Sequence, residues 1–212
     1  MARTGSARKP DERSAATRRA LVDAAVEVLR TQGFAGATAR AIAGRAGCNQ
    51  GLVFYHFGSV LGLLLAALDE VSARRRDRYE TALASVGKAS ELVDLAVRIF
   101  SEDLDSGDAA VLVEMIAGAS STPGLGAALK TRIEPWHDFA TAALRSVLGD
   151  APVLDGVAAG DVALAVVALY LGLELLAHLD GDREPALALF EQVRRLTPLV
   201  DLLTSHHHRE VP

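Results

Sequence analysis

The chain has 212 residues, half of them apolar, so it is long enough to bury a core and wholesale disorder is excluded. Only 5% of the residues are aromatic, whereas the strong helix formers alanine and leucine abound, which predicts an all-α fold. Cys48 is the only cysteine, which excludes an intramolecular disulfide and a cysteine-rich metal site.

The net charge of −5 is unevenly distributed along the chain. Residues 1–58 contain nine Arg or Lys and four Asp or Glu, a net charge of +5, and the remainder contains thirteen and twenty-three, a net charge of −10. A basic first quarter attached to an acidic body indicates that only the first part meets a polyanion such as nucleic acid.

The first predicted helix follows a polar, basic segment, residues 1–13, which we expect to be a flexible arm. Ser14 is a plausible N-cap, and the apolar spacing of Leu21, Ala25 and Leu29 predicts a helix that ends at Gly33. The predicted start of this domain is therefore residue 14.

Two short helices follow, in the stretch "ATARAIAGRAGCNQGLVFYHF". Thr38 is expected to cap the first of them and Asn49 the second, and Gly47 can adopt the positive φ of a tight turn between them. Two short helices joined by a glycine turn are the pattern of the DNA-binding helix-turn-helix. The alternative is an ordinary three-helix subdomain with a solvated polar face.

The remaining predicted helices are longer, which brings the total to about nine. Ser59 can cap a helix to about Val86, whose "RRR" at residues 74–76 we expect to be a solvated face. Thr122 is expected to cap a helix that starts with Pro123 and bends at Pro135. The other predicted helices span residues 92–104, 108–119, 161–179 and 185–204.

The longest apolar run, "VALAVVALYLGL" from Val162 to Leu173, is shorter than the roughly 20 residues that cross a bilayer. It predicts a buried helix and no membrane partner. The N-terminus has no apolar core, so it is not a secretory signal, and we expect a cytoplasmic protein.

The stretch "TRRALVDAAVEVLRTQGFAGATARAIAGRAGCNQGLVFYHFGS" resembles the N-terminal domain of the tetracycline-repressor (TetR) family of bacterial transcription regulators. The resemblance covers about Thr17 to Leu65; beyond it, only the number and length of the helices match. It implies a homodimer, a C-terminal helical domain that binds a small molecule, and repression of transcription that this effector relieves.

The resemblance also implies the residues that contact a double-stranded DNA operator. Arg40 and Gln50 fall on base-reading positions, and these side chain types can bond guanine and adenine respectively. The other expected DNA-contacting residues are those that line the groove, Asn49, Gly51 and Tyr55, and those that contact phosphate, Thr38 and His56.

Two positions depart from the family pattern. Phe54 stands where the family usually has Tyr, and Val60 stands where it usually has Lys, so two phosphate contacts are absent. The arginines and lysine of the arm can compensate for them. The alternative is an adaptor that keeps the fold but binds DNA weakly.

Four regions are predicted: the arm (1–13), the helix-turn-helix domain (14–58), a ligand-binding and dimerisation domain (59–204) and a disordered tail (205–212). The last two helices are expected to form the homodimer, because the first is apolar around most of its circumference and the second carries an apolar stripe. The alternative is that they are core helices of a monomer.

The expected ligand site combines apolar walls with a few polar groups. Its candidate residues are Phe100, Glu114, Met115, Trp136, His137, Tyr170 and Glu174. Tyr170, Glu174 and His178 are spaced to share one helix face. The alternative is that Trp136 belongs to the core and the carboxylates to the surface.

No Ser/His/Asp spacing, phosphate loop or metal motif is present, so we expect neither an enzyme nor a cofactor or metal site. The histidines of the tail, His206 to His208, could bind a metal adventitiously. An all-α enzyme that uses two histidines with Glu114 or Glu174 is the remaining alternative.

Overall fold

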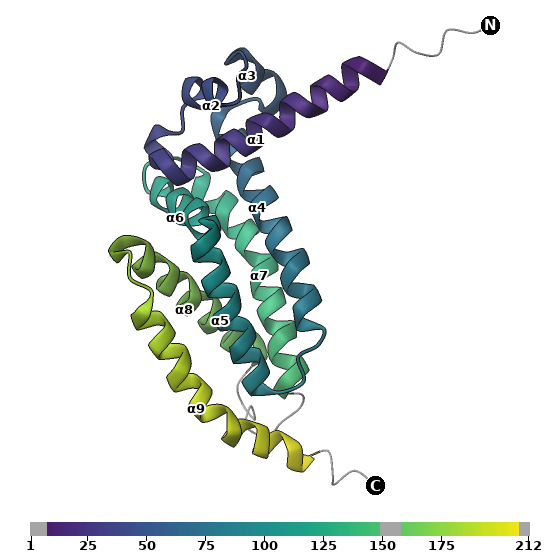
Figure 1. The fold of residues 1–212 in the computed structure, drawn as a ribbon, viewed down its shortest axis with the longest axis vertical. Coiled ribbons are helices and arrows are strands. Elements are labelled where there is room, and N and C mark those ends of the chain that lie inside the picture. The colour runs from purple at the N-terminus through teal and green to yellow at the C-terminus, as the bar shows by residue number, and fades with distance from the viewer. Residues whose placement is uncertain (1–7, 149–157, 208–212) are drawn as a thin grey trace, which may run out of the picture. The chain divides into compact units, whose positions relative to one another are not determined.

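The structure, a computed structural model, describes residues 8–148 and 158–207. Within these ranges the chain forms helices and no strand, which confirms the predicted all-α fold (Figure 1). The helices are α1 (Arg8–Gly36), α2 (Ala39–Arg45), α3 (Gly51–Phe57), α4 (Val60–Leu83), α5 (Ala89–Ser106), α6 (Asp108–Ala119), α7 (Leu125–Leu148), α8 (Ala159–Asp180) and α9 (Glu184–His207).

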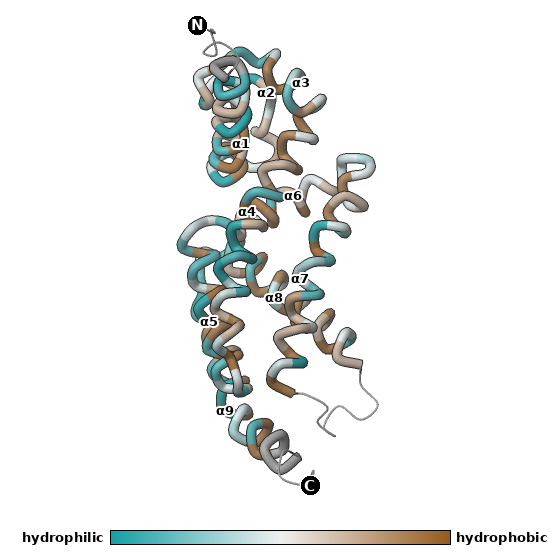
Figure 2. Tube along the Cα trace, turned by 90° about the vertical axis from the view of Figure 1, so that its right-hand side faces the viewer, coloured by the Kyte–Doolittle hydropathy of each residue, from teal (hydrophilic) through white to brown (hydrophobic). Residues whose placement is uncertain are grey.

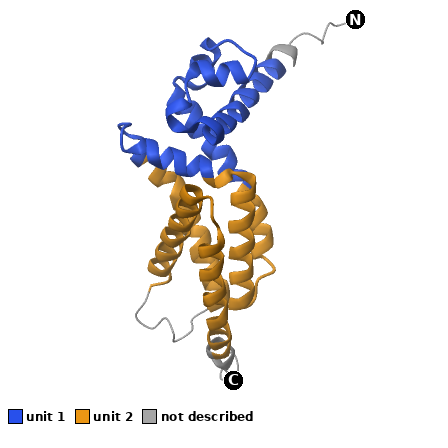
Figure 3. Ribbon diagram, turned by 60° about the vertical axis from the view of Figure 1, so that its left-hand side comes forward, with its two compact units in different colours: residues 1–74, 110–126 blue, residues 75–109, 127–212 orange. Residues whose placement is uncertain are grey.

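The helices divide into two compact units (Figure 3). Unit 1 comprises residues 1–74 and 110–126, and unit 2 comprises residues 75–109 and 127–212. The boundaries fall inside α4, α6 and α7, so each of these helices contributes residues to both units.

The core of unit 1 is built from the first three helices. The apolar face predicted for α1 is buried, and Ile42, Ala43 and Val53 from α2 and α3 are buried as well. The helix starts at Arg8, six residues before the predicted cap at Ser14, so the prediction of a flexible arm is wrong for residues 8–13. Gly33 interrupts it with a φ of 70°, as predicted, because glycine adopts positive φ without a steric cost.

The corner at Gly33 is fixed by α6, whose residues from 110 onward belong to the same unit. The Phe34 backbone N–H donates to Glu114 Oε2 at 2.8 Å. A Cβ atom on Gly118 would clash with the Phe34 ring. The end of α1 therefore rests on a specific hydrogen bond and on a close approach that requires glycine.

In unit 2, α5 packs against α8 and α9. Phe100 is fully buried, and its ring lies 5.5 Å from that of Phe190 and 5.9 Å from that of Tyr170. A second apolar cluster contains Tyr79, Leu95 and Ile99, with Trp136 packed against it. Polar contacts join α5 to α9 and to the residue that precedes it: Arg183, just before α9, binds Asp105, Arg194 binds Asp94, and the Ala89 N–H donates to Asp201.

Several predicted boundaries differ from the structure. Helix α7 begins at Leu125, not at Pro123, because Gly124 has a φ of 80° and cannot continue a right-handed helix. Helix α4 ends at Leu83 and not near Val86. Helix α9 continues to His207, so the predicted tail is helical at its start, whereas residues 208–212 of the tail, and 149–157 of the predicted loop before α8, lie outside the described residues.

Helix α8 was predicted to be buried, and within this single chain that prediction is wrong. It is long and apolar enough to cross a membrane, with a mean hydropathy of 2.1 (Figure 2). Only 22% of that stretch is buried. Its apolar residues lie on all sides, whereas its buried residues are Ala163, Glu174 and Ala177. The exposed large apolar residues of α8 are Leu164, Val166, Leu169, Leu175, Leu176 and Leu179.

Candidate functional site

The first candidate site is the α2–α3 pair, whose local structure follows from three side chains. Thr38 is extended, and its Oγ1 accepts a hydrogen bond from the Ala41 N–H at 3.2 Å, which caps α2 as predicted. Gly47 turns the chain with a φ of 66°. Asn49 was predicted to cap α3, but the N-cap residue is Gln50, whose side chain makes no capping hydrogen bond. Asn49 Oδ1 instead accepts from the Gly51 N–H at 2.8 Å, just before the helix.

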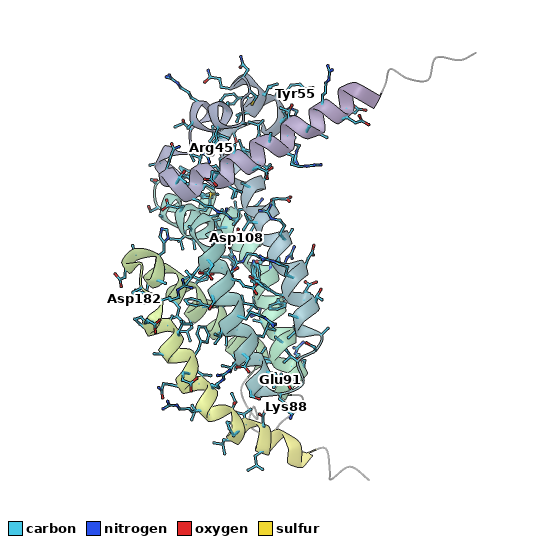
Figure 4. All side chains as sticks on the ribbon, viewed as in Figure 1. Arg45, Tyr55, Lys88, Glu91, Asp108 and Asp182 are labelled. Atoms are coloured by element: carbon cyan, nitrogen blue, oxygen red, sulfur yellow. The ribbon has the colours of Figure 1, made fainter. Side chains whose placement is uncertain are left out.

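The seven residues predicted to contact DNA lie on or next to these two helices, and most of them are exposed to solvent. Thr38, Arg40, Asn49, Gln50, Gly51 and Tyr55 are exposed, and His56 is half-buried. Tyr55 is 78% exposed and stands out from α3, with its ring edge-on to His56 at 4.9 Å (Figure 4). The arrangement can present side chain donors, acceptors and one aromatic face together.

Contacts with α1 hold both short helices in place. Arg45 of α2 pairs with Glu27 at 2.9 Å, and the Arg18 guanidinium lies 5.0 Å from the centre of the Phe57 ring of α3. Because these contacts lie beside the exposed face, the face is presented on a supported scaffold. Of the two departures from the family pattern, Phe54 is 52% exposed and Val60 is half-buried at the start of α4.

Comparison with known proteins identifies this domain. Residues 21–67 match the family model "Bacterial regulatory proteins, tetR family". This segment is therefore similar to the DNA-binding domain of the tetR family. The match covers α3 and α2 completely, together with the second half of α1 and the start of α4.

Individual relatives of this family are distant. The transcriptional regulator CymR of Pseudomonas putida is 28% identical over 127 residues, which cover 58% of this chain and 61% of CymR. The chain thus spans about three fifths of the length of this curated relative.

Two solved structures match most of this chain. A member of the TetR family from Streptomyces coelicolor A3 is 24% identical, with a TM-score of 0.63, covering 87% of this chain and 98% of that one. The regulator FadR of Bacillus subtilis, solved in complex with stearoyl-CoA, is 17% identical, with a TM-score of 0.66, covering 84% of this chain and 96% of FadR. At these identities the likeness shows the fold alone.

The second candidate site is a buried ionic cluster in unit 2. Arg75 from α4, Asp103 from α5 and Glu174 from α8 meet there, and their side chains are 4%, 0% and 0% exposed. Arg75 Nη2 donates to an oxygen of Asp103 and lies 3.3 Å from Glu174 Oε1. One nitrogen atom therefore serves both carboxylates.

The two carboxylates of this cluster are unequally satisfied. Asp103 also accepts hydrogen bonds from the hydroxyls of Tyr79, at 2.5 Å, and Tyr170, at 2.7 Å. Glu174 Oε2 is buried and, among the residues that the structure describes, has no hydrogen-bond partner. A buried polar atom without a partner is costly, so this oxygen marks a place where a ligand group could bind.

Burial and charge shift the ionisation of the cluster. Burial raises the pKa of Glu174 to about 7, and Asp103 adds to this rise while Arg75 opposes it. Burial and the Asp103 carboxylate raise the pKa of Tyr79, and burial also raises that of Tyr170, so both hydroxyls stay protonated. Burial opposes the charge of Arg75, but the two carboxylates outweigh it and raise its pKa.

Aromatic rings surround the guanidinium. The Arg75 guanidinium carbon lies 4.8 Å from the centre of the Trp136 ring, and Tyr79 and Trp136 lie 6.3 Å apart. Trp136 itself is half-buried. The predicted ligand residues Phe100, Trp136, Tyr170 and Glu174 thus come together in one region of unit 2.

An open groove of about 610 Å³ adjoins this region through Phe139, whose ring lies 6.2 Å from that of Trp136. It runs along α4 and α7, and Pro135, which lies inside α7, forms part of its wall. The groove is lined by Arg76, Glu80, Leu83, Ala84, Val86, Pro135, Asp138, Phe139, Ala142 and Ser146.

The other predicted ligand residues lie elsewhere. Glu114 and Met115 belong to unit 1, where Glu114 binds the Phe34 amide and Met115 is fully buried. His137 Nε2 lies 2.9 Å from the Gly160 carbonyl oxygen. His178 is exposed, so the predicted face of Tyr170, Glu174 and His178 is buried only at Glu174.

Three residues of the cluster were missed in the sequence: Arg75, Tyr79 and Asp103. The prediction that "RRR" forms a solvated face is wrong for Arg75, which is buried, and right for Arg74, which is exposed. The signal was its spacing, because Val71, Arg75 and Tyr79 continue the buried stripe of α4 at intervals of four residues.

Proposed function

We propose that this chain is a transcriptional regulator that binds a double-stranded DNA operator through α2 and α3 and leaves it when a small molecule binds unit 2. The observation that carries the proposal is the glycine turn between two short helices that present exposed Arg40, Gln50 and Tyr55. In such a pair the second helix enters the major groove, where Gln50 can bond adenine and Arg40 guanine. Asn49 and Gly51 would line the groove, and Thr38 and His56 would meet phosphates.

The proposed regulator is a homodimer through α8 and α9. The two helix-turn-helix domains of a dimer must lie about one DNA turn, roughly 34 Å, apart, so the two chains must be held together. Both helices leave apolar side chains uncovered, and pairing with their two-fold copies would bury them in a four-helix bundle. On α9 the exposed large apolar residues are Leu189, Val193, Leu196, Leu199 and Leu202.

This pairing also accounts for the apolar surface of α8 without a membrane, and we place the protein in the bacterial cytoplasm. The proposed regions of the chain are a basic arm (residues 1–13), the DNA-binding domain (14–58), the effector-binding and dimerisation domain (59–204) and a tail (205–212). We assign it neither a catalytic role nor a cofactor.

Release by an effector would work through linkage between the two units. Helix α4 supplies residues 60–74 to unit 1 and Arg75 and Tyr79 to the ionic cluster of unit 2. An effector that binds one conformation of the dimer better shifts the population toward it, with a typical coupling of about 1–3 kcal/mol. The bound stearoyl-CoA of FadR supports a small-molecule effector in a relative of this fold.

The test is the affinity of the purified chain for a site selected from random duplex DNA. Replacing a base-reading residue, Gln50→Ala or Arg40→Ala, should weaken specific binding by about 1–3 kcal/mol, roughly 5- to 150-fold per head, and leave weak binding to random DNA in place. Arg145→Ala on α7 removes the same charge as Arg40→Ala and serves as the control. Equal losses in the two arginine variants would contradict the assigned role of Arg40.

A second candidate function, an adaptor with weakened DNA binding, is favoured by Phe54, whose exposed ring lacks the hydroxyl that could bond a phosphate. The double substitution Phe54→Tyr, Val60→Lys separates the two functions. A regulator binds its selected site before the substitution, whereas the adaptor gains specific binding only after it.

A further inference from the structure

The buried cluster of Arg75, Asp103 and Glu174 is not electrically balanced. One guanidinium faces two carboxylates, so with both carboxylates ionised the site carries a net charge of −1 behind side chains that are at most 4% exposed. A buried charge is costly unless it is paired. A proton or a second cation would remove the imbalance.

The imbalance is concentrated on one atom. Asp103 already accepts hydrogen bonds from Arg75, Tyr79 and Tyr170. Glu174 Oε1 lies 3.3 Å from the shared Arg75 nitrogen, and Tyr170 also interacts with this carboxylate, but within the described chain its Oε2 is buried and has no hydrogen-bond partner. The second cation would therefore bind at Glu174 Oε2.

The surroundings of Glu174 favour an organic cation over a hydrated metal ion. Aromatic faces attract cations, and the Arg75 guanidinium already lies 4.8 Å from the centre of the Trp136 ring. Tyr170 and Phe100 add further rings, 5.9 Å apart. Within the described residues no group of three or more His, Cys, Asp or Glu is arranged to hold a metal ion.

The charged residues that line the groove beside Trp136 also favour a cation. Its charged lining is Glu80 and Asp138 against the single guanidinium of Arg76. It reaches the aromatic layer at Phe139, next to Trp136. A cation approaching from this side meets an excess of negative charge before it meets the rings.

We propose that unit 2 recognises an organic monocation, such as a quaternary ammonium or phosphonium compound or a protonated amine, with Glu174 as its carboxylate and Trp136 and Tyr170 as its aromatic walls. An anion is disfavoured because the site already holds two carboxylates against one guanidinium. The inference rests on the proposed effector function and names the chemical class of the effector.

Trp136 is the only tryptophan of the chain, so its fluorescence reports on this site directly. The probes are tetraphenylphosphonium and benzyltrimethylammonium, with tetraphenylborate as an anion of the same shape as the first. At pH 8 and without DNA, we expect at least one cation to quench the fluorescence saturably, and the borate to bind at least tenfold more weakly. Failure of both cations, or equal binding of the borate, would overturn the proposal.

Glu174→Gln keeps the shape of the side chain and removes its charge. We expect it to weaken cation binding at least tenfold, while the variant stays folded because it loses a buried charge. Glu134→Gln removes the same charge from the exposed surface of α7, two residues from Trp136, and should change the affinity less than twofold. Unchanged cation affinity in Glu174→Gln would also refute the proposal.

A pH series separates the carboxylate from general packing effects. The titratable groups at Glu174 are Arg75 and Tyr79 from α4, Asp103 from α5 and Tyr170 from α8, and α7 contributes Trp136 with His137 beside it. Protonation of Glu174 competes with the cation, so the affinity for the cation should fall several-fold from pH 8 to pH 6 in the wild type and in His137→Asn, but not in Glu174→Gln.

Failure of this inference can be distinguished from failure of the proposed function. A chain that binds its operator and no cation would contradict only this inference. A chain that binds the cation but no operator would contradict only the proposed regulator.

Discussion

Glu174 is a fully buried carboxylate whose ionisation works against folding. Its pKa is raised by burial from 4.5 to about 7. A raised folded-state pKa means that the stabilising contribution of the protonated group is fully present below pH 4.5 and is lost as the pH rises through about 7. Near neutral pH the protein therefore carries an internal destabilising charge.

Glu174→Gln should remove this pH dependence. Relative to the wild type, we expect its free energy of unfolding to be similar at pH 5 and higher by on the order of 1–3 kcal/mol at pH 8, from about 1.4 kcal/mol per pKa unit. Denaturant unfolding at the two pH values measures the difference. Glu191→Gln on exposed α9 is the control, and a stability difference that is independent of pH would contradict the assignment.

The contact of α6 with the end of α1 depends on one glycine. A Cβ atom on Gly118 would meet the Phe34 ring, whereas a Cβ atom on Gly126, in α7, would meet nothing within 4 Å. Overpacking of a tight contact costs about 1–3 kcal/mol, and Gly to Ala in an open helical position stabilises by up to about 1 kcal/mol. We therefore expect Gly118→Ala to lower the melting temperature and Gly126→Ala to keep or raise it.

Thermal unfolding followed by circular dichroism measures this pair of variants, and the Glu114 hydrogen bond offers a second comparison. Glu114→Gln keeps an acceptor for the Phe34 N–H, whereas Glu114→Ala leaves that amide without it. A melting temperature that is lowered equally by Gln and Ala would mean that the amide bond is not what holds the corner.

The elements differ in how far the sequence predicts them. The short helices were predictable because their signals are local: Thr38 and Asn49 bond amides within three residues, and Gly47 turns the chain by itself. The start of α7 was mispredicted because Thr122 and Pro123 are also good helix-start residues, and only the positive φ of Gly124 decides against them.

The ionic cluster was only half predictable for the same physical reason. Tyr170 and Glu174 are one helical turn apart, so their shared face is a local property. Arg75, Asp103 and Glu174 come from three different helices. A charged residue is predicted to be exposed unless a partner for its charge can be identified, and the sequence does not identify partners on other helices. Residue spacing indicates which side chains face inward, but not which of them meet.

At the level of the assembled protein, the proposed dimer depends on apolar residues that a single chain leaves exposed. Leu176 of α8 and Leu196 of α9 are both more than half exposed. Placing a charge in a four-helix interface leaves it buried and unpaired, so Leu176→Glu and Leu196→Glu should shift the protein from dimer to monomer and abolish specific DNA binding. Leu52 lies in α3, so Leu52→Glu would disturb the DNA-binding domain itself and is not a suitable control.

Sedimentation velocity measures the oligomeric state of these variants. Glu191→Gln, on an exposed position of α9, should remain dimeric. A wild type that is monomeric at micromolar concentration, or glutamate variants that stay dimeric, would contradict the assignment of α8 and α9 to the interface.

The most direct test of the proposed DNA recognition is selection of binding sites from a library of random DNA duplexes by the purified chain. We expect enrichment of a site with two-fold symmetry, whose half-sites lie about one helical turn apart. Two chains or a multiple should bind this site at least about a thousandfold more tightly than random DNA. Gln50→Ala should change or lose the preference within each half-site. Equal, weak binding to all sequences, with no enriched site, would contradict the claim that α2 and α3 read an operator.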